Sequence, residues 1–186
     1  MSGHSHAKTI QHKKAITDAK RGKTFSKLSR EISLAAKEKG GNTENNPALR
    51  LVIEKARGFN MPKENIERAI KKGTGELAGE NLESVSFEAY GPGGVAIIIE
   101  GITDNKNRTL GEVKQILGQY NAKLGGEGSA KWAFERKLKE DGSGSLEWAA
   151  KQEINVSEKD KEACEKLFEA LDENDSVQEI YTNLKI

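Results

Sequence analysis

The chain changes its hydrophobic periodicity at residues 84–102, which read SVSFEAYGPGGVAIIIEGI. Val85, Phe87 and Ala89 alternate with polar neighbours, and this period of two is typical of a half-buried strand. A glycine-rich turn then leads into an apolar run of the length expected for a buried strand. The pattern predicts two strands joined by a hairpin turn, and with them the beginning of a sheet domain.

Upstream of this stretch the apolar residues recur at intervals of three and four, as they do on one face of a helix. The spacing predicts a first helix that ends near Gly40, a second that begins at Asn46, and a third that begins at Pro62. We expect the third helix to end at Gly73, with this glycine as its C-terminal cap. Residues 23–78 are therefore predicted to form a three-helix domain.

Downstream, residues 79–186 are predicted to form two strand units of the order ββαβ and βαβ. The first unit ends in a strand at residues 130–134, and the second is a strand, a helix and a strand over residues 153–184. Between them, residues 138–150 show no hydrophobic period and are predicted to be a flexible connector. The fold class is therefore α+β: a basic arm at residues 1–22, the three-helix domain, and a small α+β sandwich domain.

The net charge of +1 conceals a strong asymmetry along the chain. Residues 1–80 carry 17 Lys and Arg against 9 Asp and Glu, a balance of +8. Residues 81–186 carry 13 against 20, a balance of −7. Charge segregated in this way predicts that the basic part meets a polyanion, while the acidic part offers a surface to a protein partner.

Basic side chains are densest from His12 to Arg30. Cations at this density repel one another unless an anion compensates them, so this segment is predicted to bind a nucleic-acid backbone. If about six of them neutralise phosphates, affinity should fall about 10³-fold between roughly 50 and 200 mM salt. A solvated helix face that binds nothing is the alternative. The candidate residues in the arm and the first helix are His4, His12, Lys13, Lys14, Lys20, Arg21, Lys23, Lys27 and Arg30.

A second candidate site precedes the helix that is predicted to begin at Asn107 or Thr109. Polar side chains just before a helix N-terminus can contact an anion or RNA, but Asn and Thr serve equally well as ordinary helix caps. Both interpretations stay open from the sequence. The candidate residues here are Asn105, Lys106, Asn107 and Arg108.

The sequence contains no Walker, Gly-x-Ser-x-Gly or His-Glu-x-x-His pattern. Cys164 shares a helical face with Leu167, so we expect a thiol in the core and not a nucleophile. His4, His6 and His12 lack a further well-spaced ligand, so no metal site is expected. We therefore predict a protein that is not an enzyme and that carries no cofactor.

No apolar run approaches the roughly 20 residues that a membrane span needs, so no membrane association is expected. The opening residues MSGHSHAKTIQHKK lack the apolar segment of a secretion signal. A single cysteine cannot form an internal disulfide. Together these features predict a cytoplasmic protein.

Recognisable motifs run in order along the whole chain. They are GHS (3–5), HKK (12–14), DAKRGK (18–23), NP (46–47), NMPKENI (60–66), RAIKKG (68–73), YGPGG (90–94), DNKNRT (104–109), GS (128–129) and VQEIYTN (177–183). In these motifs the chain resembles the YebC/PmpR family.

The resemblance implies a non-enzymatic, cytoplasmic protein that binds nucleic acid and has a basic three-helix N-terminal domain. The family is generally described as DNA-binding transcriptional regulators, and some relatives are translational activators that work on the ribosome. We therefore predict a DNA-binding transcriptional regulator, with a translational activator that binds ribosomal RNA as the alternative. A third hypothesis is a protein scaffold that self-associates through its opposite charges.

The chain departs from the family pattern at two places. Ser5-His6-Ala7 stands where the family usually has Ser-Lys-Trp, which removes a cation and an aromatic ring. Family members also usually carry a third α/β domain between the strand that ends at Arg136 and the one that resumes near Gln152. The resemblance therefore implies a two-domain short form.

Overall fold

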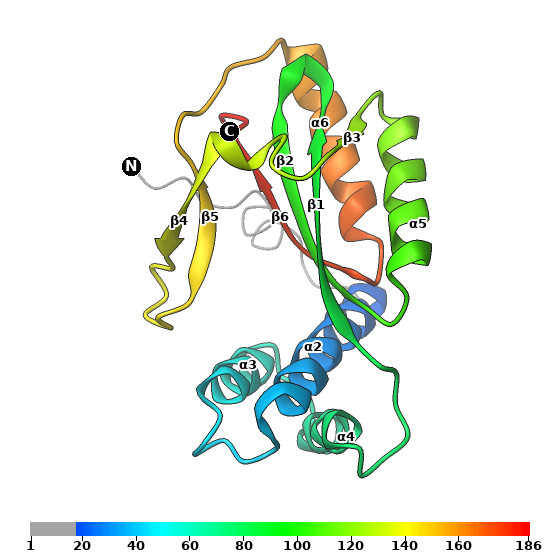
Figure 1. The fold of residues 1–186 in the computed structure, drawn as a ribbon, viewed down its shortest axis with the longest axis vertical. Coiled ribbons are helices and arrows are strands. Elements are labelled where there is room, and N and C mark those ends of the chain that lie inside the picture. The colour runs from blue at the N-terminus through cyan, green and yellow to red at the C-terminus, as the bar shows by residue number, and fades with distance from the viewer. Residues whose placement is uncertain (1–17) are drawn as a thin grey trace. The chain divides into compact units, whose positions relative to one another are not determined.

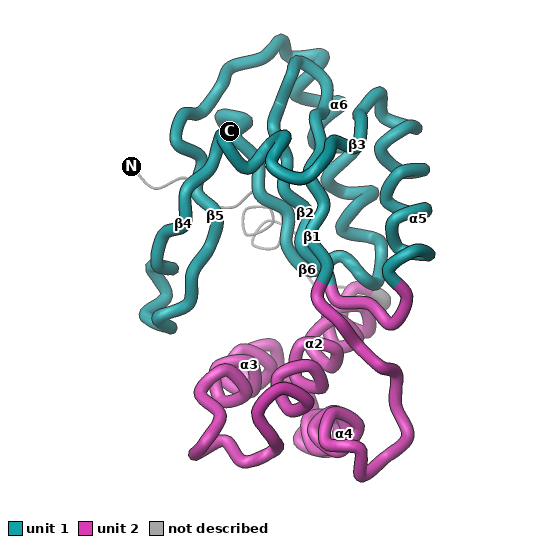
Figure 2. The backbone as a smooth tube through the Cα atoms, viewed as in Figure 1, with its two compact units in different colours: residues 1–15, 85–101, 106–186 teal, residues 16–84, 102–105 magenta. Residues whose placement is uncertain are grey.

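The computed structural model describes residues 18–186, which fall into two compact units (Figure 2). We call residues 18–84 with 102–105 the helical unit, and residues 85–101 with 106–186 the sheet unit. Each unit is described by itself below. The combination of N-terminal helices with a small sheet confirms the predicted α+β class.

The helical unit contains α2 (Asp18–Lys39), α3 (Pro47–Gly58) and α4 (Lys63–Thr74) (Figure 1). These are the three predicted helices. Their apolar stripes meet in one core. Its buried members are Leu28, Ile32, Ala35, Ala36, Leu49, Ile53, Ala56, Met61, Ile66 and Ala69.

Asn46 caps α3 as predicted and also ties that helix to α2. The side chain is fully buried, and its Oδ1 accepts a hydrogen bond from the backbone N–H of Leu49 at 3.0 Å. Its Nδ2 donates to the carbonyl oxygens of Ala35 and Gly40, both at 2.8 Å. Since every polar atom of this buried amide has a partner, the turn between α2 and α3 is held in one conformation.

The third helix does not end at Gly73 as predicted, but continues to Thr74, and Gly75 takes the left-handed cap with φ of 83°. Gly73 instead marks the crossing of α4 over α2. A Cβ atom on residue 73 would lie 2.3 Å from the carbonyl oxygen of Ser33, so only glycine fits there. Beside it the Ser33 hydroxyl donates to the Ala69 carbonyl at 2.8 Å.

The sheet unit contains a four-stranded sheet in the order β3-β1-β2-β6. The strands are β1 (Glu83–Tyr90), β2 (Ala96–Thr103), β3 (Lys123–Gly125) and β6 (Val177–Thr182). Helices α5 (Lys106–Gln119) and α6 (Glu158–Asp172) cover one face (Figure 1). A hairpin of β4 (Phe134–Leu138) and β5 (Leu146–Ala150), with the 3₁₀ turn η2 (Lys131–Ala133) before it, contributes to a second apolar cluster.

Both faces of β2 are covered, which explains its continuous apolar run. Ile97 and Ile99 pack in the cluster that includes α5 and α6, whereas Ala96 and Ile98 pack in the cluster that includes Phe134. All four β2 residues are fully buried. A strand covered on both faces needs apolar side chains at successive positions and not in alternation.

Residues 138–150 differ from the expected flexible connector, because β5 pairs with β4 in register from Phe134↔Ala150 to Leu138↔Leu146. Trp148 anchors the hairpin: its Nε1 donates to Glu100 at 2.8 Å, and the Arg136 guanidinium lies 3.8 Å from its ring centroid. These contacts involve residues far apart in the sequence, so no local hydrophobic period predicts β5.

Two other segments also differ from the predicted strands. Residues 130–134 enter the fold as the turn η2, and the strand begins only at Phe134. Residues 153–156 make a single isolated bridge, between Ile154 and Leu184. The observed order is therefore ββαβββαβ in place of ββαβ-βαβ.

Glu88 fixes the turn before β4. This carboxylate is only 4% exposed and accepts hydrogen bonds from the backbone N–H groups of Gly128, Ala130 and Lys131 at 2.7–2.8 Å. Burial alone would raise the pKa of Glu88, but the three N–H donors and the nearby Lys131 ammonium outweigh it and hold the pKa below its ordinary value.

The crossing of α2 and α4 predicts the effect of adding one methyl group. Gly73→Ala should lower the free energy of unfolding by about 1–3 kcal/mol, because the helices must separate to admit the Cβ. Urea denaturation followed by helical circular dichroism measures this change. Gly22→Ala in α2 is the control: its Cβ meets nothing within 4 Å, so stability should rise by about 0.5–1 kcal/mol. Equal effects of the two substitutions would contradict the close crossing.

The lowered pKa of Glu88 predicts a pH-dependent contribution to stability. A carboxyl group with a depressed folded pKa stabilises fully above its unfolded pKa, and the contribution is lost as the pH falls through the folded pKa. Glu88→Gln should therefore cost about 2 kcal/mol at neutral pH and progressively less below about pH 4. Urea unfolding at neutral pH and below about pH 4 measures this cost. Glu83→Gln, which changes an exposed carboxyl group on β1, is the control. A cost that does not change with pH would contradict this account of the buried carboxylate.

Candidate nucleic-acid interface

Helix α2 carries a stripe of cations on the side opposite its buried face. Its members recur at intervals of three, four or seven residues, and at 100° per residue they fall within a sector of about 100°. We call this set the α2 stripe. It consists of Lys20, Lys23, Lys27, Arg30 and Lys37.

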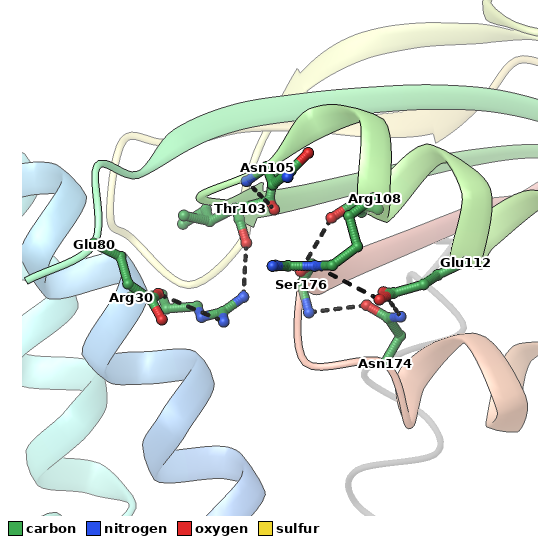
Figure 3. Close-up of polar contacts among 10 residues, drawn as sticks. Arg30, Glu80, Thr103, Asn105, Arg108, Glu112, Asn174 and Ser176 are labelled. Atoms are coloured by element: carbon green, nitrogen blue, oxygen red, sulfur yellow. Dashed lines mark hydrogen bonds and ion pairs between the residues drawn. The ribbon is translucent and has the colours of Figure 1, made fainter.

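The C-terminal members of the α2 stripe bind within the helical unit. Arg30 donates to the Ile102 carbonyl at 3.2 Å and lies 3.7 Å from the Glu80 carboxylate, and its side chain is 16% exposed (Figure 3). Lys37 donates to Asn81 Oδ1 at 2.6 Å and to a backbone carbonyl next to it. These two cations therefore fasten neighbouring chain segments to α2, a role that the charge pattern did not reveal for Arg30.

The N-terminal members of the stripe lie nearer to solvent. Lys20 is exposed, as is Arg21 beside it, while Lys23 and Lys27 are half-buried. Residues 20–27 therefore present most of the predicted cations of α2 at the surface of the helical unit. The other predicted residues of the basic segment, His4, His12, Lys13 and Lys14, lie outside the described residues, as does His6.

Helix α4 adds three exposed cations that were not among the predicted site residues. Arg68, Lys71 and Lys72 lie on the side of α4 opposite the buried Ile66 and Ala69. Within residues 20–186 none of the three forms an ion pair. The sequence already showed Lys71 and Lys72 as favourable charges in the last helical turn. The same helical period that located the core would have shown that they share an outward face with Arg68.

The loop before α5 and the first turn of this helix, which begins at Lys106 and not at Asn107 or Thr109 as expected, combine structural and exposed side chains. Thr103 is buried, and its hydroxyl accepts a hydrogen bond from the N–H of Asn105 at 3.0 Å. Thr109 is also buried and donates to Ser176 at 3.3 Å. The threonines therefore serve local structure, whereas Asn105, Lys106 and Asn107 are exposed.

Arg108 is held by a short polar network within the sheet unit (Figure 3). Its Nε lies 3.6 Å from Glu112, one helical turn along α5. Glu112 also accepts a hydrogen bond from Asn174 at 2.8 Å. The carboxylate thus compensates the charge of Arg108 in place, while Arg108 and Lys106 are both exposed in the first turn of α5.

The one cysteine considered in the sequence behaves as a core residue. Cys164 is fully buried, as predicted, and burial, together with Asp160 and Glu165, raises the pKa of its thiol to about 11. Such a thiol stays protonated at neutral pH and is a poor nucleophile. Among the residues that the structure describes, no group of three or more His, Cys, Asp or Glu could hold a metal ion. No helix within residues 18–186 is both long and apolar enough to cross a membrane.

The chain matches two family models along most of its length. Residues 5–76 match the TACO1/YebC protein N-terminal domain. Residues 82–141 and 138–184 match the TACO1/YebC second and third domain. The division between these two segments falls in the β4–β5 hairpin.

Curated relatives are similar over the whole chain or most of it. A "Probable transcriptional regulatory protein" of Fervidobacterium nodosum is 40% identical over 238 positions, covering 100% of this chain and 94% of the relative. One of the same name from Dictyoglomus turgidum is 57% identical over 137 residues, covering 74% of this chain and 55% of the relative. Among solved structures, a conserved hypothetical protein of Aquifex aeolicus superposes with a TM-score of 0.85 at 35% identity, covering 95% of both chains.

The length of these alignments supports the short form. The alignment with the Fervidobacterium protein has 238 positions, 52 more than the 186 residues of this chain. The relative therefore has about 50 further residues within the aligned region. The split family match indicates that the chain lacks them at the tip of the β4–β5 hairpin.

Proposed function

We propose that this chain, which belongs to the TACO1/YebC family, binds a nucleic-acid backbone through its helical unit and thereby regulates gene expression. The observation that carries the proposal is the set of accessible cations on α2 and α4. The ligand we favour is duplex DNA, because the relatives are named as transcriptional regulatory proteins.

The charge balance of the helical unit supports a polyanionic ligand. Residues 18–84 with 102–105 contain 14 Lys and Arg against 11 Asp and Glu. Even if every acidic side chain were paired within the unit, three cations would be left over. A phosphate chain can supply the missing negative charge, and binding it would release condensed counterions.

The helical unit favours contacts with phosphates over contacts with bases. Its aromatic residues are Phe25 and Phe59, and both pack against the core. Without an exposed aromatic ring among residues 20–84, the unit lacks a platform on which bases could stack. Cations that contact phosphates position a protein on a nucleic acid but read little sequence.

This mode of binding also keeps ribosomal RNA as a second candidate ligand. A protein that recognises backbone shape can use a folded RNA as readily as a duplex DNA. Crosslinking in cells distinguishes the two. Enrichment on promoter DNA supports a transcriptional regulator, whereas enrichment on ribosomal RNA with none on promoters overturns it in favour of a translational activator.

Removing accessible cations should weaken binding in a salt-dependent way. In the triple variant Lys20→Ala, Arg21→Ala, Lys23→Ala, the slope of log affinity against log salt should fall by about 3 in magnitude, since three phosphate contacts are lost. Fluorescence anisotropy with a duplex DNA and with a structured ribosomal RNA fragment, each at several salt concentrations, measures the slope.

A matched triple variant on α6 controls for net charge. Lys159→Ala, Lys161→Ala, Lys166→Ala removes the same three charges from the sheet unit and should leave the slope unchanged. If both triple variants reduce the slope equally, the effect comes from overall charge and not from α2. If neither does, α2 is not the binding surface.

A further inference from the structure

Trp132 is the most accessible aromatic side chain of the sheet unit. It lies in the turn η2 and is 65% exposed. Among residues 20–186 no other aromatic side chain falls in the exposed class. The stacking surface that the helical unit lacks is thus present on this turn.

The indole ring is held in place by its own polar edge. Its Nε1 donates to the Tyr90 hydroxyl at 2.8 Å and to the Ser129 carbonyl at 2.9 Å. The Tyr90 hydroxyl itself donates to the same Ser129 carbonyl. Since the one polar atom of the ring is satisfied within the turn, the accessible part of Trp132 is apolar ring surface.

The turn beneath the ring is rigidly anchored. The Glu88 carboxylate accepts hydrogen bonds from three backbone N–H groups of this turn, those of Gly128, Ala130 and Lys131. On either side of Trp132, Ala130 and Ala133 are buried in the cluster that includes Phe134. A ring presented on such a turn loses little conformational freedom when a ligand stacks on it.

Two lysines accompany the exposed ring. Lys131 precedes it, with a side chain that is 33% exposed and lies 3.6 Å from Glu88. Lys151 is exposed, and its backbone N–H donates to the Ala133 carbonyl at 2.9 Å, which places it beside the turn. Residues 131–151 carry five Lys and Arg against four Asp and Glu, whereas residues 81–186 as a whole have a balance of −7. A polyanion is therefore not repelled at this turn as it would be elsewhere in the acidic half.

From these features we propose that Trp132 is a stacking platform for an unpaired base of RNA. Unpaired bases are a regular feature of folded RNA and stack on aromatic side chains, whereas intact duplex DNA presents none. The inference rests on the proposed function with its second candidate ligand, a folded RNA, in place of duplex DNA. It assigns to the sheet unit a contact that differs in chemistry from the phosphate contacts of the helical unit.

Substitution of Trp132 tests the proposal on the full chain. Trp132→Leu keeps an apolar side chain but removes the ring, and should weaken binding of an unstructured oligouridine about 5- to 150-fold, the range for one stacked base. Trp132→Phe keeps a ring without the indole N–H and should retain most of the affinity. Affinity for duplex DNA and far-ultraviolet circular dichroism should stay unchanged in both variants.

Fluorescence offers a direct readout, because the chain has two tryptophans. A base stacked on the Trp132 ring should quench the emission of the unmodified chain as oligouridine is added, and this quenching should be lost in Trp132→Phe. Duplex DNA should bind without this quenching. Oligouridine binding that leaves the emission unchanged would overturn the proposal.

A matched control separates stacking from general apolar contact. Leu138→Ala removes a side chain of similar exposure, 66%, from the adjacent hairpin. If this variant weakens oligouridine binding as much as Trp132→Leu does, the surface is an apolar docking site and the stacking proposal fails. It fails likewise if Trp132→Leu binds oligouridine as tightly as the unmodified chain. Failure of the proposed function is distinct, because the α2 triple variant then leaves the salt slope for every nucleic acid unchanged.

Discussion

The close crossing of α2 and α4 is the constraint on which the helical unit depends. At this point the Ser33 carbonyl approaches residue 73 so closely that only glycine is accommodated, and the Ser33 hydroxyl bonds to Ala69. Two helices that touch through backbone cannot slide or rotate without losing this fit. The crossing thereby fixes which sides of α2 and α4 face outward, and those sides carry the cations of the proposed interface.

The sheet unit depends on a second constraint, the burial of β2 on both faces. The helix side is filled by α5 and α6, and the opposite side is filled by residues of η2, β4 and β5. The hairpin therefore belongs to the fold even though relatives have about 50 further residues in this region. Glu88, on the neighbouring strand β1, completes this side by binding the turn that carries Trp132.

Sequence reasoning was accurate where the signal is local. The Asn46 cap, the three helices and the buried Cys164 follow from residue type and helical period, and the structure confirms them. It failed where the decisive partner lies far along the chain. Strand β5 depends on Trp148 meeting Glu100, and the role of Gly73 depends on Ser33. The same holds for Arg30 among the predicted site residues. Its contacts with Glu80 and Ile102 could not be predicted, because these partners are 50 or more residues away in the sequence.

By itself the sequence determined the three N-terminal helices, the α+β class and the separation of charge. The hydrophobic period of a helix depends on residues close together in the chain, and net charge is a sum over the sequence. Only the tertiary structure decided how those charges are used. It showed that Arg30 and Lys37 bind within the helical unit and that the Trp132 ring is left open to solvent. The exposure and the ion pairs of a side chain depend on which residues are its neighbours in the folded protein, and these neighbours are determined by tertiary packing.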